Sequence, residues 1–429
     1  MMQEAIQEAD PPLLHAFTGV GIELEYMIVQ RDGLDVRPFA DRLLLEKSDG
    51  PEGEGRVVNE VRRGALGWSN ELVMHVIEIK NRRPAASLSS LPDAFQAEVR
   101  AINARLAAMD AQLMPGAMHP WMDPLAETHI WPHDNDAIYR AYDRIFDSKS
   151  HGWANLQSMH INLPFAGDDE FARLHAAIRL VLPILPALAA SSPIAEGRST
   201  GWCDYRMHVY ADNARTIPSI TGMVVPETVT HRAGYEQRIL APMYRDIAAL
   251  DPEHVLQEEW LNSRGAIARF ERNAIEIRVV DTQECPQADL AVAAASTDAV
   301  RRLYQAGDDV LVAQREMPTA ALASILHDCI RDADATIIRN DAYLRLLDFP
   351  ERSASANDLW RFLVGRMMED DAGQARQWQA PLQVMIEHGP LARRLLRAVG
   401  RDFSRQHLQA VYARLCDCLR DGRMFVEEE

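Results

Sequence analysis

Two segments near the start and middle of the chain alternate polar and aliphatic residues with a period of two, the pattern of a β-strand with one polar face. In the segment 21–27, Glu23 and Glu25 fall on one face and aliphatic residues on the other. In the segment 156–163, His160 shares its face with a serine and an asparagine, opposite methionine, isoleucine and leucine. Both segments therefore predict strands that bury one face and present chemical groups on the other.

Two further segments repeat this pattern. The sequence Ile-Glu-Ile-Arg-Val places Glu276 and Arg278 on one face, with branched aliphatic residues on the other. In the segment 71–80, Glu78 lies between two isoleucines, whereas Glu71 has the opposite parity. Glu71 can therefore reach the same site as Glu78 only if it precedes the strand or if a bulge intervenes.

The polar faces of the four predicted strands are mainly acidic. Each segment alone fits an ordinary solvent-facing sheet surface, but such a surface usually mixes lysine, threonine and serine with its acids. Carboxylates crowded on neighbouring strands repel one another unless cations lie among them. Oxygen ligands with an occasional imidazole suit Mg²⁺ or Mn²⁺. The combined pattern predicts a cluster of divalent cations of the kind that holds a polyphosphate.

The second part of the chain is predicted to be helical. From about Pro286 onward apolar residues recur with helical spacing, and turn or cap signals separate the segments. Helices are expected near 287–307, 318–345, 356–370, 373–400 and 404–421. The glycine-rich, charged segment 43–67 is expected to form a hairpin-like excursion or a mobile loop. Together with the strands, these helices predict an α+β fold.

No linker-like stretch divides the chain, so one catalytic domain is predicted. Residues 1–18 are expected to form an N-terminal extension, followed by the domain at 19–429. Its sheet core is expected over about 19–285 and its helical part over about 286–423. A chain of 429 residues is long enough to bury a large core.

Charge and hydropathy argue against two classes of partner. The chain has 63 acidic and 45 basic residues, a formal net charge of −18. A surface this negative repels nucleic-acid phosphates and anionic lipids, so neither nucleic acid nor a membrane is an expected partner. The apolar stretch 174–195 contains Arg179 and two prolines. It is therefore predicted to be a buried helix that runs into a loop rather than a membrane span.

The five cysteines are odd in number and widely spread. This distribution favours a reduced, cytoplasmic protein. Cys416 and Cys418 lack a second pair at zinc-site spacing, so a zinc site is not favoured. No heptad run marks the C-terminal helices, so the sequence leaves a homo-oligomer open.

A series of motifs, in order, resembles the glutamate–cysteine ligases, and especially their carboxylate–amine ligase branch. Gly-Ile-Glu-Leu-Glu at 21–25 resembles the family's G-I-E-x-E strand, and Ile-Glu-Ile-Arg at 275–278 with Asp281 resembles V-E-x-R-x-x-D. The other resembling segments are the acidic strand at 70–79, Gly-Ala-Met-His-Pro at 116–120, Tyr139-Arg140, Ser-Met-His-Ile-Asn at 158–162, Ala-Ser-Ser-Pro at 190–193 with Thr-Gly-Trp and Tyr-Arg after it, and 387–393. Order and spacing hold from about residue 19 to 420.

This resemblance implies a glutamine-synthetase-like catalytic fold, with a curved, mostly antiparallel sheet, flanking helices and a helical C-terminal region. Its concave face would bind ATP, metals and both substrates. ATP would phosphorylate a carboxylate, and an amine would attack the acyl phosphate to give an amide, ADP and phosphate. The implied partners are small-molecule carboxylate and amine substrates, with glutamate and cysteine as the first hypothesis.

The resemblance also implies roles for individual residues. Glu276 and Arg278 would be catalytic, with Arg278 stabilising the transferred phosphoryl group; its alternative role is an ion pair with Glu276. Arg206, like Arg278, would bind the nucleotide, or else clamp the substrate carboxylate through its bidentate fork. His160 has an alternative as a buried histidine hydrogen-bonded within the sheet. The implied ligands of Mg²⁺, or of Mn²⁺ in its place, are Glu23, Glu25, Glu71, Glu78, His160 and Glu276.

The sequence departs from the family pattern at His75, Lys80-Asn81 and Asn162. A ligase for a different carboxylate and amine is therefore one alternative. A non-catalytic nucleotide-binding regulatory protein with the same fold is a second, and a metal-dependent phosphatase or kinase is a third. Retention of all six candidate ligands together with Arg278 favours an enzyme.

Overall fold

An eight-stranded sheet forms the centre of the structure, a computed structural model that describes residues 13–46, 55–370, 373 and 375–426. The sheet runs in the order β11-β12-β8-β1-β6-β5-β4, and β7 pairs with the second half of β1. All of these pairings are antiparallel. The strands are β1 (Gly21–Gln30), β4 (Glu60–Arg63), β5 (Leu66–Asn70), β6 (Val76–Asn81), β7 (Ala111–Met114), β8 (Ser158–Pro164), β11 (Ala266–Arg269) and β12 (Ala274–Asp281).

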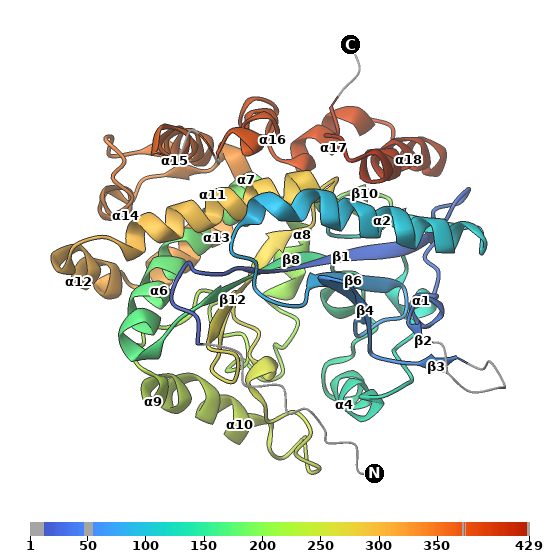
Figure 1. The fold of residues 1–429 in the computed structure, drawn as a ribbon, viewed down its shortest axis with the longest axis horizontal. Coiled ribbons are helices and arrows are strands. Elements are labelled where there is room, and N and C mark those ends of the chain that lie inside the picture. Colours follow the sequence, from blue (N-terminus) through green and yellow to red (C-terminus); the bar gives the residue numbers. More distant parts are fainter. Residues whose placement is uncertain (1–12, 47–54, 371–372, 374, 427–429) are drawn as a thin grey trace, which may run out of the picture.

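Most of the helices cover one face of this sheet and lie above the strands in Figure 1, whereas those at 136–146 and 232–247 lie below them. The longer helices are α2 (Leu91–Ala107), α4 (Asp136–Phe146), α6 (Gly167–Val181), α11 (Pro286–Tyr304), α12 (Asp308–Glu316), α13 (Thr319–Asp332), α15 (Ala356–Asp370), α16 (Arg376–His388), α17 (Leu391–Val399) and α18 (Arg405–Asp421). The shorter helices are α1 (Ala40–Leu43), α3 (Pro124–Glu127), α5 (His151–Ala154), α7 (Leu185–Ala189), α8 (Tyr205–Tyr210), α9 (Arg232–Tyr235), α10 (Ala241–Ile247) and α14 (Asp341–Leu346).

Helix α11 is the central element of the helical layer. It contacts α2 and α6 beside it and α15 and α16 farther out. Apolar residues occur all around it, and most of them are buried, as expected for a helix enclosed on every side. The region after β12 is therefore mainly helical and packs against the back of the sheet, whereas the front of the sheet stays accessible.

Strand β1 shows how the sequence separates the two faces. Ile22, Leu24 and Tyr26 are fully buried in the main hydrophobic core. Glu23 and Glu25 project from the opposite face and line a pocket. Because successive side chains of a strand point to opposite faces, burial of the aliphatic positions fixes where both carboxylates point.

The register of the sheet brings the polar positions of neighbouring strands together. Glu23 of β1 lies opposite His160 of β8 on one side and Lys80 of β6 on the other. Glu25 lies opposite Glu78 of β6. The four strands with acidic faces, β12, β8, β1 and β6, are consecutive in the sheet. Their polar faces therefore form one continuous surface.

The apolar segment predicted to be a core helix is buried. The stretch Gly167–Ala189 is long and apolar enough, by length and composition, to cross a membrane. However, 94% of its most apolar window is buried inside the protein. It packs against α11 and α13 as part of the helical layer.

The single helix expected over 318–345 is interrupted, so that prediction is wrong. Helix α13 ends at Asp332, and β13 (Ile337–Ile338) pairs with β14 (Ala354–Ser355) on either side of α14. This pairing joins residues that are distant in the chain. Helical spacing of apolar residues could not reveal it.

The helix expected over 373–400 is also two helices. Helix α16 ends at His388, and Gly389 follows with φ of 76°. Pro390 then precedes α17. Positive φ at a glycine and a following proline both end a helix, so Gly389 and Pro390 separate α16 from α17. Helix α12, between α11 and α13, was not among the predicted helices.

The segment 43–67 contains a hairpin, one of its two predicted forms. Strands β2 (Leu45–Glu46) and β3 (Arg56–Val57) pair as a short hairpin. Residues 47–54 lie outside the described residues. The prediction missed β4, which joins the edge of the main sheet by pairing with β5.

A buried ion pair ties α17 to the end of the sheet. Arg394 and Glu284, which follows β12, have side chains that are 1% and 0% exposed and bond through both carboxylate oxygens. Arg394 also donates to the carbonyls of Gly389 and Phe425. The pair therefore joins three segments of the chain.

Removing one member of this pair should destabilise the protein strongly. Arg394→Met leaves Glu284 buried without its cation, which costs about 3–5 kcal/mol of unfolding free energy. The double variant with Glu284→Met should recover most of that loss, because no charge stays buried. Urea unfolding followed by circular dichroism measures both values. An equal loss in the single and double variants would contradict this account.

Candidate active site

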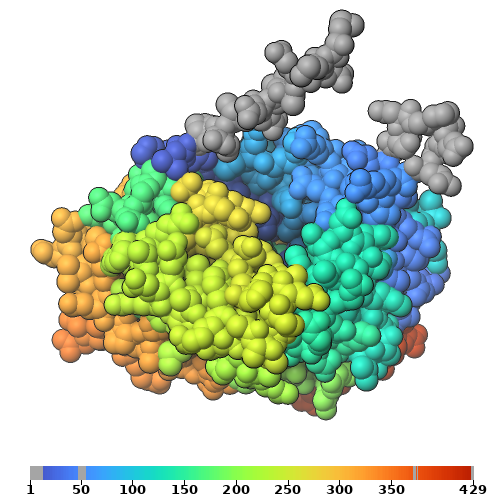
Figure 2. Space-filling view, turned by 90° about the horizontal axis from the view of Figure 1, so that it is seen from below, coloured from blue at the N-terminus to red at the C-terminus, as the bar shows by residue number. Residues whose placement is uncertain are grey.

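The acidic face of the sheet is the floor of a pocket of about 460 Å³. Figure 2 shows the hollow from its open side, between the blue N-terminal strands, the teal region of α4 and the yellow region before β12. All eight residues singled out from the sequence line this pocket: Glu23, Glu25, Glu71, Glu78, His160, Arg206, Glu276 and Arg278.

Glu71 reaches the same site as Glu78, despite its opposite parity, because it lies before the start of β6. Strand β5 ends at Asn70 and β6 begins at Val76, so Glu71 precedes the strand that carries Glu78. This is one of the two arrangements that let both carboxylates reach one site. Potential ligand atoms of Glu71, Glu78 and Glu25 lie within 4.8 Å of one another.

The acidic floor contains two overlapping groups with metal-ligand geometry. Glu25, Glu71 and Glu78 form one group, and Glu23, Glu78 and His160 form the other. In each group the potential ligand atoms lie within 4.8 Å of one another. Carboxylate oxygens with one imidazole suit Mg²⁺ or Mn²⁺. Glu78 belongs to both groups, which is the arrangement expected of a carboxylate that bridges two ions.

The electrostatics of the floor also fit cation binding. Burial, with the negative charges of Glu25 and Glu78, raises the pKa of Glu71 well above its usual value. Burial likewise raises the pKa of Glu78, helped by the charges of Glu23 and Glu25, although Lys80 opposes this rise. In both cases the ionised carboxylate is disfavoured first by burial and then by neighbouring carboxylates. Divalent ions would relieve that repulsion.

His160 is fixed between two polar neighbours. Its Nδ1 lies 3.0 Å from Oε2 of Glu23, and its Nε2 lies 3.0 Å from Oγ of Ser158. Burial alone would lower the pKa of His160, but the bond to Glu23 and the charges of Glu276 and Glu25 raise that pKa to about 9. The same bond lowers the pKa of Glu23 to about 2, against the effect of burial.

Glu276 and Arg278 form an ion pair at the edge of the acidic floor. Nε of Arg278 lies 2.7 Å from Oε1 of Glu276, and Nη1 of Arg269 lies 3.3 Å from Oε2. Glu276 is not part of either ligand group found among the described residues, and its Oε1 lies 3.7 Å from Nδ1 of His160. Arg278 is 21% exposed and lines the pocket. The ion pair named as an alternative role of Arg278 is thus present, and the guanidinium still reaches the pocket.

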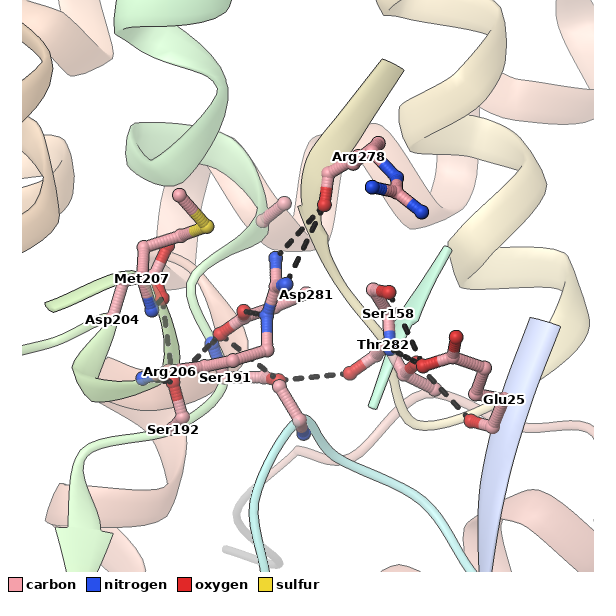
Figure 3. Close-up of polar contacts among 12 residues, drawn as sticks. Glu25, Ser158, Ser191, Ser192, Asp204, Arg206, Met207, Arg278, Asp281 and Thr282 are labelled. Atoms are coloured by element: carbon pink, nitrogen blue, oxygen red, sulfur yellow. Dashed lines mark hydrogen bonds and ion pairs between the residues drawn. The ribbon is translucent and has the colours of Figure 1, made fainter. Parts of the chain in front are cut away.

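Arg206 lies deeper than the other predicted residues. Its side chain is 2% exposed, and its Nε lies 2.5 Å from Oδ1 of Asp281 (Figure 3). Nη1 and Nη2 each lie 3.4 Å from the carbonyl oxygen of Arg278. The guanidinium fork therefore faces protein acceptors at the inner edge of the pocket.

An aromatic wall, which the sequence patterns did not indicate, bounds one side of the pocket. It consists of Tyr139, Tyr142, Trp153, Tyr210 and Trp260. The ring of Tyr142 lies 5.1 Å from that of Trp153 and 6.0 Å from that of Trp260, measured between centroids. These residues come from α4, α5, α8 and the segment before β11. No periodic pattern connects them, and only Tyr139 falls in a recognised motif.

Two of the four departures from the family pattern, Lys80 and Asn162, contact the acidic floor. Asn162 donates to Oε1 of Glu23 at 3.1 Å. Nζ of Lys80 lies 3.0 Å from Oε1 of Glu78. His75 instead is 1% exposed and bonds the carbonyl of Ala154, so it does not line the pocket.

Comparison with known proteins assigns this fold and site to a family. The model of glutamate-cysteine ligase family 2 matches residues 19–414. The chain belongs to this family. Family membership supports an ATP-dependent carboxylate–amine ligase and confirms the resemblance seen in the sequence motifs.

Individual relatives of this ligase family member span most of the chain. An uncharacterised protein of Archaeoglobus fulgidus is 32% identical over 95% of this chain and 100% of its own length. A protein of Bradyrhizobium diazoefficiens, provisionally named glutamate–cysteine ligase 2, is 24% identical over 73% of each chain. The structure of Francisella tularensis glutamate–cysteine ligase in complex with AMP matches 94% of this chain and 88% of that one. Its TM-score is 0.55 at 11% identity, a likeness of fold that confirms the predicted α+β class.

Loss of Glu78 should separate metal binding from folding. Because Glu78 belongs to both ligand groups, Glu78→Gln should abolish most of the stabilisation by Mn²⁺, which for the wild type is about 2.7 kcal/mol at 100 times Kd. Without metal, the variant should be at least as stable as the wild type at neutral pH. A carboxyl group with a raised folded-state pKa costs stability when it ionises, and glutamine removes that cost.

Urea unfolding with and without Mn²⁺ measures both effects. Glu60→Gln is the matched control, because Glu60 also pairs with Lys80, at 3.5 Å, but belongs to neither ligand group. The control should keep the full effect of Mn²⁺. Full stabilisation of Glu78→Gln by Mn²⁺ would show that the ions bind elsewhere.

Proposed function

We propose that this ligase family member joins glutamate to cysteine through an amide bond, with ATP as the source of energy. The γ-carboxylate of glutamate would accept the γ-phosphoryl group of ATP, and ADP would leave. The uncharged amine of cysteine would then attack the acyl carbon, and phosphate would leave as the amide forms. The nitrogen would lose its surplus proton to solvent.

The observation that carries this proposal is the place of Arg278 beside the two ligand groups. When bound there, Mg²⁺ ions would offset the negative charge that develops during phosphoryl transfer. Glu23, Glu25, Glu71, Glu78 and His160 are the residues placed to hold them.

Arg278 would act directly on the transferred group. Its Nε is engaged by Glu276 and its Nη1 donates to the carbonyl of Asn262 at 3.2 Å, which fixes the plane of the guanidinium. The Arg278 side chain is 21% exposed and lines the pocket. A guanidinium held in this way needs no reorganisation as charge develops on the phosphoryl oxygens, which is the condition for strong electrostatic catalysis.

The two sides of the pocket would divide the ligands between them. The acidic floor with its cations suits the triphosphate and the reacting carboxylate. The aromatic wall, centred on Tyr142, offers apolar surface for the less charged parts of the ligands. Nucleotide use by this chain is part of the proposal, supported by its family and by the site chemistry.

A direct assay tests the substrate pair. The purified protein with ATP, Mg²⁺, glutamate and cysteine should release ADP and phosphate in equal amounts and form a dipeptide whose mass is that of both amino acids less one water. Enzyme-coupled ADP detection and mass spectrometry measure these products. ADP formation only with a different carboxylate and amine would reject this pair but keep the ligase class. Phosphate release without an amide would indicate a phosphatase.

Replacing Arg278 should slow the reaction without unfolding the protein. Arg278→Lys keeps the charge but loses the guanidinium fork, so kcat should fall by about 10²–10³-fold. Arg302→Lys is a matched control, because Arg302 is 17% exposed, pairs with Asp298 at 2.7 Å and lies on α11 away from the pocket. The control should keep wild-type kcat. Equal rates for Arg278→Lys and the wild type would rule out the proposed role of Arg278.

A further inference from the structure

Strand β12 contains a β-bulge at the catalytic arginine. Ile277 pairs with Ile161 of β8, whereas Val280 pairs with Met159, so two residues of β12 lie opposite one residue of β8. Arg278 is one of the two. A bulge bends its strand and changes the direction of a side chain. The direction of the Arg278 side chain therefore depends on how this bulge is held.

Arg206 binds the bulge from the α8 side. As seen in Figure 3, its guanidinium lies between the carboxylate of Asp281 and the backbone carbonyl of Arg278. Asp281 is the last residue of β12, three positions after Arg278. One planar guanidinium thus connects both ends of the bulged segment, and its rigid fork suits this contact better than an ammonium group.

Asp281 is itself held on every side. Its Oδ2 accepts from the backbone N–H of Ser191 at 2.7 Å and from Oγ of Ser192 at 2.8 Å. Asp281 is 0% exposed, and a buried carboxylate that accepts this many bonds has a defined orientation. Arg206 is therefore anchored to a fixed point.

The same turn of the chain also reaches the acidic floor. Thr282, directly after Asp281, donates from Oγ1 to the carbonyl of Glu25 at 3.2 Å. Asp281 pairs with Ser158 of β8. The backbone N–H of Ser158 donates to Oε2 of Glu25 at 2.7 Å. The end of β12 that Arg206 holds therefore contacts Glu25 of β1 and Ser158 of β8, in addition to carrying Arg278.

We propose that Arg206 is a positioning residue, which holds the bulge of β12 and so aims Arg278, and that it does not bind substrate or nucleotide through its own guanidinium. This inference rests on the proposed function, because it concerns how Arg278 reaches the reacting phosphoryl group. It differs from the role that the family resemblance implies. The nearly complete burial of Arg206 and its three bonds to protein acceptors support it.

The first test compares kcat with KM. Arg206→Lys keeps a positive charge beside Asp281 but cannot also hold the carbonyl of Arg278. A misplaced Arg278 should lower kcat by about 10–100-fold. KM for ATP and for the carboxylate substrate should stay within about twofold, because no ligand contact is lost. A rise of KM of about tenfold or more, with kcat retained, would show direct substrate binding and overturn the proposal.

The matched control is Arg394→Lys. Arg394 is also a buried arginine that bonds one carboxylate and two backbone carbonyls, but it lies outside the pocket. It controls for the general damage of replacing a buried arginine. Its kcat should equal that of the wild type. An equal fall of kcat in both variants would show that the loss of activity in Arg206→Lys comes from lower stability alone, which would overturn the proposal.

A double-variant cycle provides the sharpest test. If Arg206 acts only through Arg278, then Arg206→Lys should change kcat by less than about twofold in a protein that already carries Arg278→Lys. Independent roles would instead multiply the two losses. Multiplied losses would overturn the proposal. An inactive wild type would reject the proposed function itself, so the two failures can be told apart.

A second variant disturbs the bulge without removing a charge. A Cβ at Gly265 would lie 2.5 Å from Cγ1 of Val279, the other bulged residue, so Gly265→Ala must displace it. This variant should also lower kcat while KM stays unchanged. Amide hydrogen exchange over residues 277–283, measured without ligands, should rise in Gly265→Ala and Arg206→Lys but not in Arg394→Lys. Unchanged exchange in Arg206→Lys would contradict the proposal without reference to activity.

Discussion

Repulsion among buried carboxylates is the constraint on which the rest of this structure depends. Glu23, Glu25, Glu71 and Glu78 converge on one pocket, and burial together with the charges of neighbouring carboxylates raises the pKa values of Glu71 and Glu78 against the opposing charge of Lys80. Such a surface persists only if interactions elsewhere in the structure offset this repulsion. Here the aliphatic faces of the same strands bury a large core, and the pocket keeps the acids accessible to cations.

The antiparallel register turns this constraint into a site. Four consecutive strands contribute polar side chains to this face, so the candidate ligands on them keep their relative positions as long as the strands stay paired. The irregularity in the pairing of β12 with β8 falls at Arg278, which forms an ion pair with Glu276 at the edge of the floor. Arg206 and Asp281 lie behind that irregularity. Regular pairing thus places Glu23, Glu25, Glu78 and His160, and a local departure from it lies at Arg278, the proposed catalytic arginine.

Sequence patterns predict the strands and their acidic faces because alternation with a period of two follows from strand geometry alone. They also predict the family, since several motifs occur in order. They do not place Glu71, whose reach depends on where β6 begins. They miss the aromatic wall, because Tyr142 and Trp260 come from unrelated segments that meet only in the folded chain. The burial of Arg206 is equally hidden, because it follows from contact with Asp281, which is 75 residues away.

The central claim is that the two ligand groups of the acidic floor hold divalent cations next to the triphosphate of ATP. Anomalous diffraction from crystals grown with Mn²⁺ and a non-hydrolysable ATP analogue tests it most directly. The account predicts manganese peaks at coordination distance from Glu78, with Glu23 and His160 on one side and Glu25 and Glu71 on the other. Peaks confined to other surfaces, with ordered nucleotide elsewhere, would contradict it.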